Sequence, residues 1–350
     1  MKNLKRLGII FILIFSIYFV LKNPEVMERE TSNVNQKEML LEKKQQIETS
    51  HKSDLDTHLN KWLGKHVDEL YEEFGDPSRK DVTKYGYNAY VYNEKQNEYI
   101  VFGIDNEEIV TVFGTGLNLS LNMFSIGDSY EQILEHVAFE EKISFRKGTS
   151  TYTIELTDDD ILQHPLVKIG QGKFMQFYFD TIADQFIGVR YMTSDILLKQ
   201  RNFNIVYRGK LPKTKELTDK EQHAVDNDAE QQIMDITNTI REIYNKNPLQ
   251  PSDSVRDIAY LHSQDMFNEQ YFSHENKQGE SLSDRLTEKG ISYQLAGENI
   301  AANYVDALAV VIGWLNSEGH RESLLHDEFT HIGVGVYQEY YTQNFIKQIN

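Results

Sequence analysis

The last third of the chain holds the residues best suited to chemistry. His274 follows an aromatic residue and a serine, Glu298 stands in a Gly-Glu-Asn segment, and His320 follows Gly319. Two neutral imidazoles and one carboxylate form the ligand set of an open zinc site, whose bound water would be activated for hydrolysis. The same groups without a metal could transfer protons, because histidine titrates near neutral pH. Only a tertiary fold could bring these three residues together.

No motif in the sequence identifies an activated nucleophile. The chain has no cysteine, which excludes disulfides, thiolate chemistry and cysteine-based zinc sites. It also lacks a His-Glu-x-x-His motif and a Gly-x-Ser-x-Gly motif. Ser273 and Ser317 lie near the histidines, but nothing marks either as activated. For each candidate taken singly, a structural hydrogen bond is the simpler interpretation.

The elements that must position these residues are helices followed by strands. Apolar spacing predicts helices at 233–243, 254–268, 284–289 and 306–316, and closing strands at 331–337 and 341–346. Helices first and strands last indicate helices packed on an antiparallel sheet. We expect Glu298 in a turn opened by Gly297, and His320 just beyond the end of the helix through Trp314.

Residues 58–207 are predicted to form a duplicated α+β module. Each copy has a helix followed by strands, at 87–92, 99–104 and 109–113, then at 152–156, 174–179 and 186–191. Its aromatic residues could line a binding face, although filling sheet cores is the simpler interpretation; they are Tyr85, Tyr87, Tyr90, Tyr92, Phe102 and Phe113. His136 and His164 are isolated, so no catalytic group is predicted here.

The N-terminus has the form of an export signal. A basic flank over residues 1–6 precedes an uncharged apolar run at 7–21, with no small-x-small cleavage site after it. We predict a signal anchor at 1–22 that places the C-terminal bulk outside the membrane, with a cleaved signal peptide as the alternative. A polar stalk is expected at 23–57 and a charged linker at 208–230. The last domain then spans 231–350.

Composition limits the partners. The formal net charge is −18 and the sequence pI is about 5.1, so nucleic acid would be repelled and is not expected as a partner. Apolar residues make up 40% and aromatic residues 11%, enough for the cores of two domains.

An ordered set of motifs over residues 232–348 carries a family resemblance. The pieces are Asn238-x-x-Arg241, Leu249, Phe272-Ser273-His274, Gly297-Glu298-Asn299-Ile300, Trp314-x-x-Ser317-x-Gly319-His320-Arg321 and Ile332-Gly333-Val334-Gly335-Val336. Together they resemble the CAP superfamily (cysteine-rich secretory, antigen 5 and pathogenesis-related proteins), in its bacterial SCP-like extracellular branch. Residues 60–205 resemble a CAP-associated domain of Bacillus-like bacteria, and the whole layout is similar to that of membrane-attached members.

The resemblance implies an α-β-α sandwich with a central cleft. In the family this cleft holds two histidines, two acidic residues and, in some members, a divalent ion such as zinc or magnesium. Carried over to this chain, His274, His320 and Glu298 are the metal or acid–base candidates, and Asn299 also lines the cleft. Ser317 stands where many members have the second acid; the adjacent Glu318 would point about 100° away around a regular helix.

We therefore expect an extracytoplasmic protein, anchored by its N-terminus, whose cleft binds a lipid, a cell-wall component or a peptide. The first alternative is a metal-dependent hydrolase of peptide or wall substrates that uses His274, Glu298 and His320. The second alternative is a structural or interaction protein of the cell envelope or spore, in which the duplicated module docks to a partner.

Overall fold

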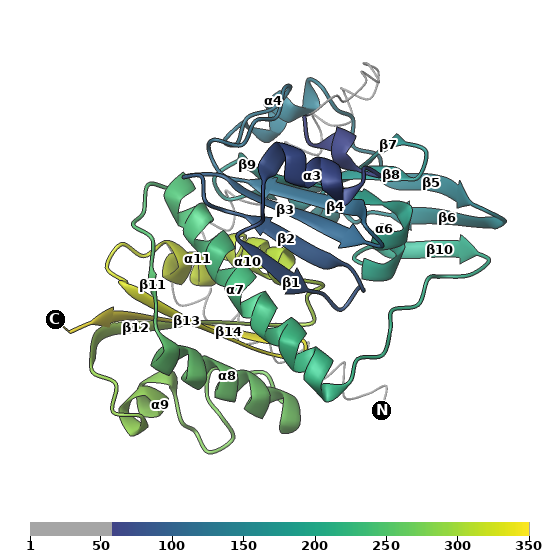
Figure 1. Ribbon diagram of the computed structural model, residues 1–350. Coiled ribbons are helices and arrows are strands. Elements are labelled where there is room, and N and C mark those ends of the chain that lie inside the picture. Colours follow the sequence, from purple (N-terminus) through teal and green to yellow (C-terminus); the bar gives the residue numbers. More distant parts are fainter. Residues whose placement is uncertain (1–57, 350) are drawn as a thin grey trace. The chain divides into compact units, whose positions relative to one another are not determined.

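The computed structural model describes residues 58–349. The predicted anchor and stalk lie outside these residues. Within 58–349, no helix combines the length and apolarity needed to cross a membrane. Both modules of the described chain belong to a single compact unit, and its secondary structure is mixed α and β (Figure 1).

A seven-stranded antiparallel sheet forms the first module, in the order β1-β2-β3-β4-β9-β8-β7. Its strands are β1 (Arg79–Val82), β2 (Asn88–Tyr92), β3 (Tyr99–Asp105), β4 (Glu108–Thr115), β7 (Leu166–Gly170), β8 (Lys173–Asp180) and β9 (Gln185–Thr193). The central pair β4 and β9 joins the two copies, since each is the last strand of its repeat. The short helices of this module are η1 (Asn60–Trp62), α3 (Val67–Phe74), α4 (Tyr130–Leu134), α5 (Asp158–Gln163) and α6 (Ser194–Gln200).

The second copy differs from its prediction in the first of its three strands. The predicted strand 152–156 falls in β6 (Ser150–Glu155), which pairs with β5 (Lys142–Lys147) and β10 (Asn204–Arg208) in a separate three-stranded sheet. The strand that completes the second copy is β7, which the sequence analysis did not predict. It is a short edge strand in which Lys168 interrupts the apolar residues, so its local pattern is weak.

Helix α7 (Asp219–Ile243) replaces most of the predicted charged linker, so that prediction was wrong from residue 219 onward. The helix begins with a capping box between Thr218 and Glu221. Two of its acidic residues are buried because they have partners elsewhere in the fold. Asp226 accepts a hydrogen bond from the Gln338 backbone, and Glu230 accepts one from the backbone of Val336.

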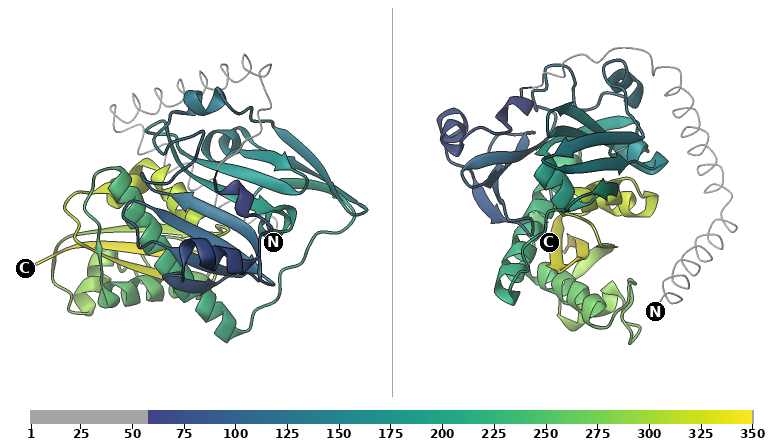
Figure 2. Two further views of the ribbon diagram at one scale, coloured as in Figure 1. Left: turned by 45° about the horizontal axis from the view of Figure 1, so that its top comes forward. Right: turned by 90° about the vertical axis from the view of Figure 1, so that its right-hand side faces the viewer.

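The second module is a four-stranded sheet between two layers of helices (Figure 1). The sheet order is β11-β13-β14-β12, formed by β11 (Gln250–Pro251), β12 (Tyr293–Ala302), β13 (His331–Tyr337) and β14 (Tyr340–Gln348). Helices α8 (Asp253–Asn268) and α9 (Leu282–Glu288) cover one face, and α7, α10 (Ala307–Leu315) and α11 (Glu318–Leu325) cover the other. Helix α7 also contacts β1 and β3, so it lies between the two modules (Figures 1 and 2).

Two glycines of β13 allow α8 to lie directly on the sheet. A Cβ atom at Gly333 would come within 2.2 Å of the Arg256 backbone nitrogen, and one at Gly335 within 1.9 Å of the Tyr260 nitrogen. The Gly-x-Gly pattern in this strand therefore reflects close backbone contact with a helix.

A polar network joins the modules next to α11. The Asp180 carboxylate at the end of β8 is fully buried and accepts hydrogen bonds from Arg321 and from the Tyr244 hydroxyl. Asn316 accepts a bond of 2.7 Å from the backbone nitrogen of Thr181. The residues on both sides of the α10–α11 junction are therefore held by the first module.

Candidate functional site

Glu298 lies within β12, the outer strand of the sheet, and not in the predicted turn. Its side chain is 4% exposed. Arg285 Nη2 donates to Oε2 over 2.6 Å, and His274 Nδ1 donates to Oε1 over 3.0 Å. Both carboxylate oxygens of Glu298 are thus engaged by positively polarised groups from the α8–α9 side of the sheet.

His274 lies in the segment after α8 and exposes 56% of its side chain. Because an ionised carboxylate only accepts hydrogen bonds, the Nδ1 atom facing Glu298 carries the hydrogen. In the neutral ring, Nε2 is then an acceptor. Phe272, two residues earlier in the chain, is 48% exposed and offers an apolar surface in the same segment.

Arg285 contacts the predicted site residues but was not itself predicted from the sequence. It lies on α9, where Leu286 packs into the core. Besides its bond to Glu298, its Nη1 donates to the carbonyl oxygens of His274 and Glu280, each over 3.1 Å. The guanidinium therefore fixes both the carboxylate and the segment that carries His274. Nothing local in the sequence distinguished it from a surface arginine of a short helix.

His262 on α8 was also missed. Its side chain is buried, and Nε2 donates to the Ser273 carbonyl over 3.0 Å while lying 3.9 Å from Glu298 Oε1. Burial lowers the pKa of His262, which keeps the ring neutral around physiological pH. Through this hydrogen bond, His262 fixes the backbone of the residue before His274.

His320 approaches the same sheet edge from the opposite face. It lies within α11, a separate helix that starts after Ser317, and not beyond the end of the Trp314 helix as predicted. Its Nδ1 is hydrogen-bonded to Ser317 Oγ over 2.7 Å, and Asn299 donates to its carbonyl over 3.0 Å. Burial lowers the pKa of His320, and repulsion from His274 when both rings are protonated lowers it further.

The fold therefore brings the three predicted residues together at the edge of β12. Consecutive side chains of a strand point to opposite faces. The Glu298 carboxylate therefore contacts the His274 ring on one face, and the Asn299 amide donates to the His320 carbonyl on the other. Burial alone would raise the pKa of Glu298, but the hydrogen bond from His274 and the charge of Arg285 keep that pKa below its ordinary value of 4.5. The carboxylate is ionised at neutral pH.

The donors do not fit a divalent cation. Among residues 58–349, no three histidine, aspartate or glutamate side chains are arranged to hold a metal ion. Arg285 places a permanent positive charge 2.6 Å from the one carboxylate. At the position of the second acid, Ser317 is bonded to His320, and the adjacent Glu318 is exposed. The predicted zinc or magnesium site at His274, Glu298 and His320 gains no support from this arrangement.

Comparisons with known proteins agree with the fold. Residues 63–203 match the family model "CAP-associated N-terminal", and residues 234–349 match the "Cysteine-rich secretory protein family". The uncharacterized membrane protein YlbC of Bacillus subtilis is 36% identical over 348 residues, covering 99% of this chain and 100% of that protein. The resemblance predicted from the ordered motifs is confirmed.

Two solved structures are similar over most of the chain. The first is the 1.5 Å crystal structure of an extracellular protein containing an SCP domain from Bacillus anthracis. It is 38% identical with a TM-score of 0.79, and the similarity covers 86% of this chain and 98% of that one. The second is a cysteine-rich secretory protein from Staphylococcus aureus, at 22% identity and a TM-score of 0.74, covering 83% and 93%. The second shows similarity of fold alone.

Proposed function

The chain belongs to the cysteine-rich secretory protein (CAP) family, and from this premise we propose that it acts outside the cytoplasm by binding an amide-bearing ligand, such as a peptide, in the cleft of His274, Glu298 and His320. The basic and apolar N-terminal segments support this location, as do a relative named as a membrane protein and a similar structure described as extracellular.

One observation carries the proposal: the Glu298 carboxylate is already satisfied by Arg285 and His274. The carboxylate therefore orients the site instead of taking a metal or a proton. What remains for a ligand is the Nε2 atom of each of the two imidazoles. In neutral His274 this atom accepts a hydrogen bond. When the Ser317 hydroxyl donates to Nδ1 of His320, the Nε2 atom of that ring carries the hydrogen and donates.

One acceptor and one donor together would be complementary to an amide group, which offers both an N–H and a carbonyl oxygen. The exposed ring of Phe272, two residues before His274 in the chain, would contact an apolar side chain of the same ligand. A lipid tail would leave the two imidazoles unpaired on binding, which costs about 1–3 kcal/mol for each polar group. A peptide or a peptide-bearing wall component fits better.

A hydrolase is the second candidate, and one observation favours it. Ser317 Oγ lies 2.7 Å from His320 Nδ1, as a nucleophile lies near its general base. However, these residues are three apart at the start of α11, so the bond is also a local contact of a helix terminus. In addition, no described carboxylate orients this histidine.

Histidine-selective ¹⁵N NMR tests the proposal. We expect acetyl-Ala-Phe-Ala-amide to shift the Nε2 resonances of His274 and His320 in a saturable way. His274→Ala and His320→Ala should each weaken binding about tenfold, while His223→Ala, at an exposed position on α7, should leave it unchanged. Thermal unfolding of every variant checks the fold.

Two outcomes would contradict this proposal. One is the absence of any response of the two rings to peptides. The other is tight one-to-one zinc binding that both alanine variants abolish, which would establish a metal site. Turnover of a peptide that is lost in Ser317→Ala, with the fold intact, would favour the hydrolase.

A further inference from the structure

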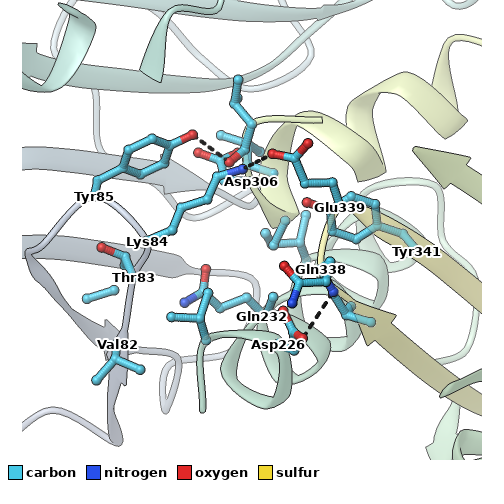
Figure 3. A pocket seen from close by; sticks show the side chains of 18 of the residues that line it. Val82, Thr83, Lys84, Tyr85, Asp226, Gln232, Asp306, Gln338, Glu339 and Tyr341 are labelled. Carbon is cyan, nitrogen blue, oxygen red and sulfur yellow. Dashed lines mark hydrogen bonds and ion pairs between the residues drawn. The ribbon is translucent and has the colours of Figure 1, made fainter. Parts of the chain in front are cut away.

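A cavity of about 360 Å³ lies between the two modules (Figure 3). The first module contributes the β1–β2 connection and one face of β2, β3 and β4. The second contributes α7, the segment between β12 and α10, and the β13–β14 hairpin. None of His262, His274, Arg285, Glu298 and His320 lines it, so it is distinct from the candidate site described above.

Tyrosine rings form much of its wall. Tyr85 and Tyr87 are stacked, with ring centroids 6.4 Å apart and an interplanar angle of 15°. Tyr85 donates to the Val305 carbonyl over 2.7 Å, a bond that crosses between the modules. Tyr341 approaches from the hairpin side (Figure 3). Because these rings are held by packing and hydrogen bonds, they present preformed flat apolar surfaces.

Four of the five charged groups of the cavity are already paired with one another. Arg190 forms a largely buried ion pair with Asp306, at 2.7 Å. Lys84 pairs with Glu339 across the modules at 3.1 Å (Figure 3). Asp226 is the fifth charged residue of the lining, so carboxylates outnumber cations there. Consequently, no unpaired positive charge of the lining is available for an anionic ligand.

Uncharged polar groups of the lining, by contrast, remain available for hydrogen bonds to a ligand. The Tyr87 hydroxyl and the side-chain amides of Gln338 and Asn303 line the cavity and make no hydrogen bond to another residue of 58–349. Tyr87 is only 7% exposed, so bulk water does not replace that bond freely. Asn303 and Gln338 also have positive φ values of 66° and 58°, conformations that cost free energy in non-glycine residues and concentrate at functional sites.

We propose that this inter-module cavity is a binding site for a neutral, hydroxyl-rich ring compound, that is, a saccharide of one or two units. A sugar ring has apolar C–H faces for the tyrosine rings and hydroxyl groups for Tyr87, Gln338 and Asn303. The cavity volume falls within the range of about 300–1,000 Å³ typical of small-molecule sites. An acyl chain would leave the polar groups unpaired, at about 1–3 kcal/mol each.

Calorimetric titration of the purified full chain with cellobiose tests this inference. Cellobiose is neutral and carries no amide, so it does not probe the imidazole cleft. We expect saturable one-to-one binding that Tyr87→Phe weakens about fivefold, by removal of one hydroxyl. Ala229→Phe, which adds a ring from α7 into the cavity, should abolish it. Tyr207→Phe, at an exposed tyrosine of β10, and His274→Ala should leave it unchanged.

Thermal unfolding accompanies each titration, and cellobiose should raise the melting temperature of the wild type but not that of Ala229→Phe. Failure of cellobiose, lactose and maltose alike to bind the folded wild type would overturn the inference. So would binding that Tyr87→Phe and Ala229→Phe leave intact. Displacement of the sugar by decanoate, or tighter binding of galacturonate than of cellobiose, would assign the cavity to a lipid or to an anion instead.

Discussion

Replacing Arg285 with methionine tests the reasoning on which the site depends. The change keeps an unbranched apolar stem but removes the charge, the bond to Glu298 and the bonds to two carbonyl groups. The side chains of Arg285 and Glu298 are only 11% and 4% exposed. Removal of one partner from a buried ion pair costs about 3–5 kcal/mol, because the remaining charge is left buried without compensation. We expect Arg285→Met to lower the free energy of unfolding by that amount at pH 7.

The matched control is Lys347→Met. This lysine pairs with Glu328 at 2.7 Å, but the two side chains are 33% and 59% exposed. Exposed pairs contribute about 0–1 kcal/mol, so this variant should be nearly neutral. Urea unfolding at pH 7 compares the two variants. The double variant Arg285→Met/Glu298→Gln should be more stable than Arg285→Met alone, because it no longer buries an unpaired carboxylate.

The pH dependence supplies an independent check. In the wild type the pKa of folded Glu298 lies below its ordinary value of 4.5, so its stabilising contribution is present above pH 4.5 and is lost as the pH falls through the folded pKa. Without Arg285, burial should raise that pKa, and stability should then fall as the pH rises. The difference in free energy of unfolding between the wild type and Arg285→Met should thus be smaller at pH 4 than at pH 7. A loss below 1 kcal/mol at pH 7, or an equal loss at both pH values, would refute the reasoning.

Three further predictions concern other parts of the fold. Asp180→Ala leaves Arg321 without its buried partner and should cost about 3 kcal/mol in urea unfolding, with faster proteolysis between the modules. Burial raises the pKa of Glu230 to about 7, so its contribution to stability is full below pH 4.5 and is lost as the pH rises through 7. In unfolding experiments from pH 4.5 to 8, Glu230→Gln should therefore show a smaller decline in the free energy of unfolding than the wild type. Gly335→Ala should prevent tight packing of α8 and destabilise by several kcal/mol, whereas Gly319→Ala, with nothing within 4 Å of the new Cβ, should be neutral or stabilising by up to about 1 kcal/mol.

Local patterns predicted several elements well. Helix α8 was predicted at 254–268 and is observed at Asp253–Asn268, and the predicted strand 331–337 coincides with β13. Their apolar residues repeat with the period of the element, which needs no knowledge of the partner. The start of α7 was missed because its first turns carry charged residues whose partners, such as the Val336 backbone, come from distant segments.

Glu298 illustrates why the conformation at the site could not be predicted locally. Gly-Glu-Asn favours a turn, but pairing with β14 places Glu298 opposite Asn344 in a strand. Strand formation depends on such cross-strand neighbours more than on the residue's own preference. The same holds for His320, which the sequence placed beyond a helix and the fold places within α11.

The sequence by itself determined the family, the two modules, and the identity of His274, Glu298 and His320 as the residues of interest, because ordered motifs and local periodicity are properties of the chain alone. Only the tertiary structure decided what these residues can do. Arg285 neutralises the carboxylate and disfavours a cation there, and this ion pair exists only when α9 packs beside β12. The inter-module cavity is likewise a property of packing, since its walls come from segments on either side of α7. Burial and charge pairing depend on such non-local contacts, which no single stretch of sequence contains.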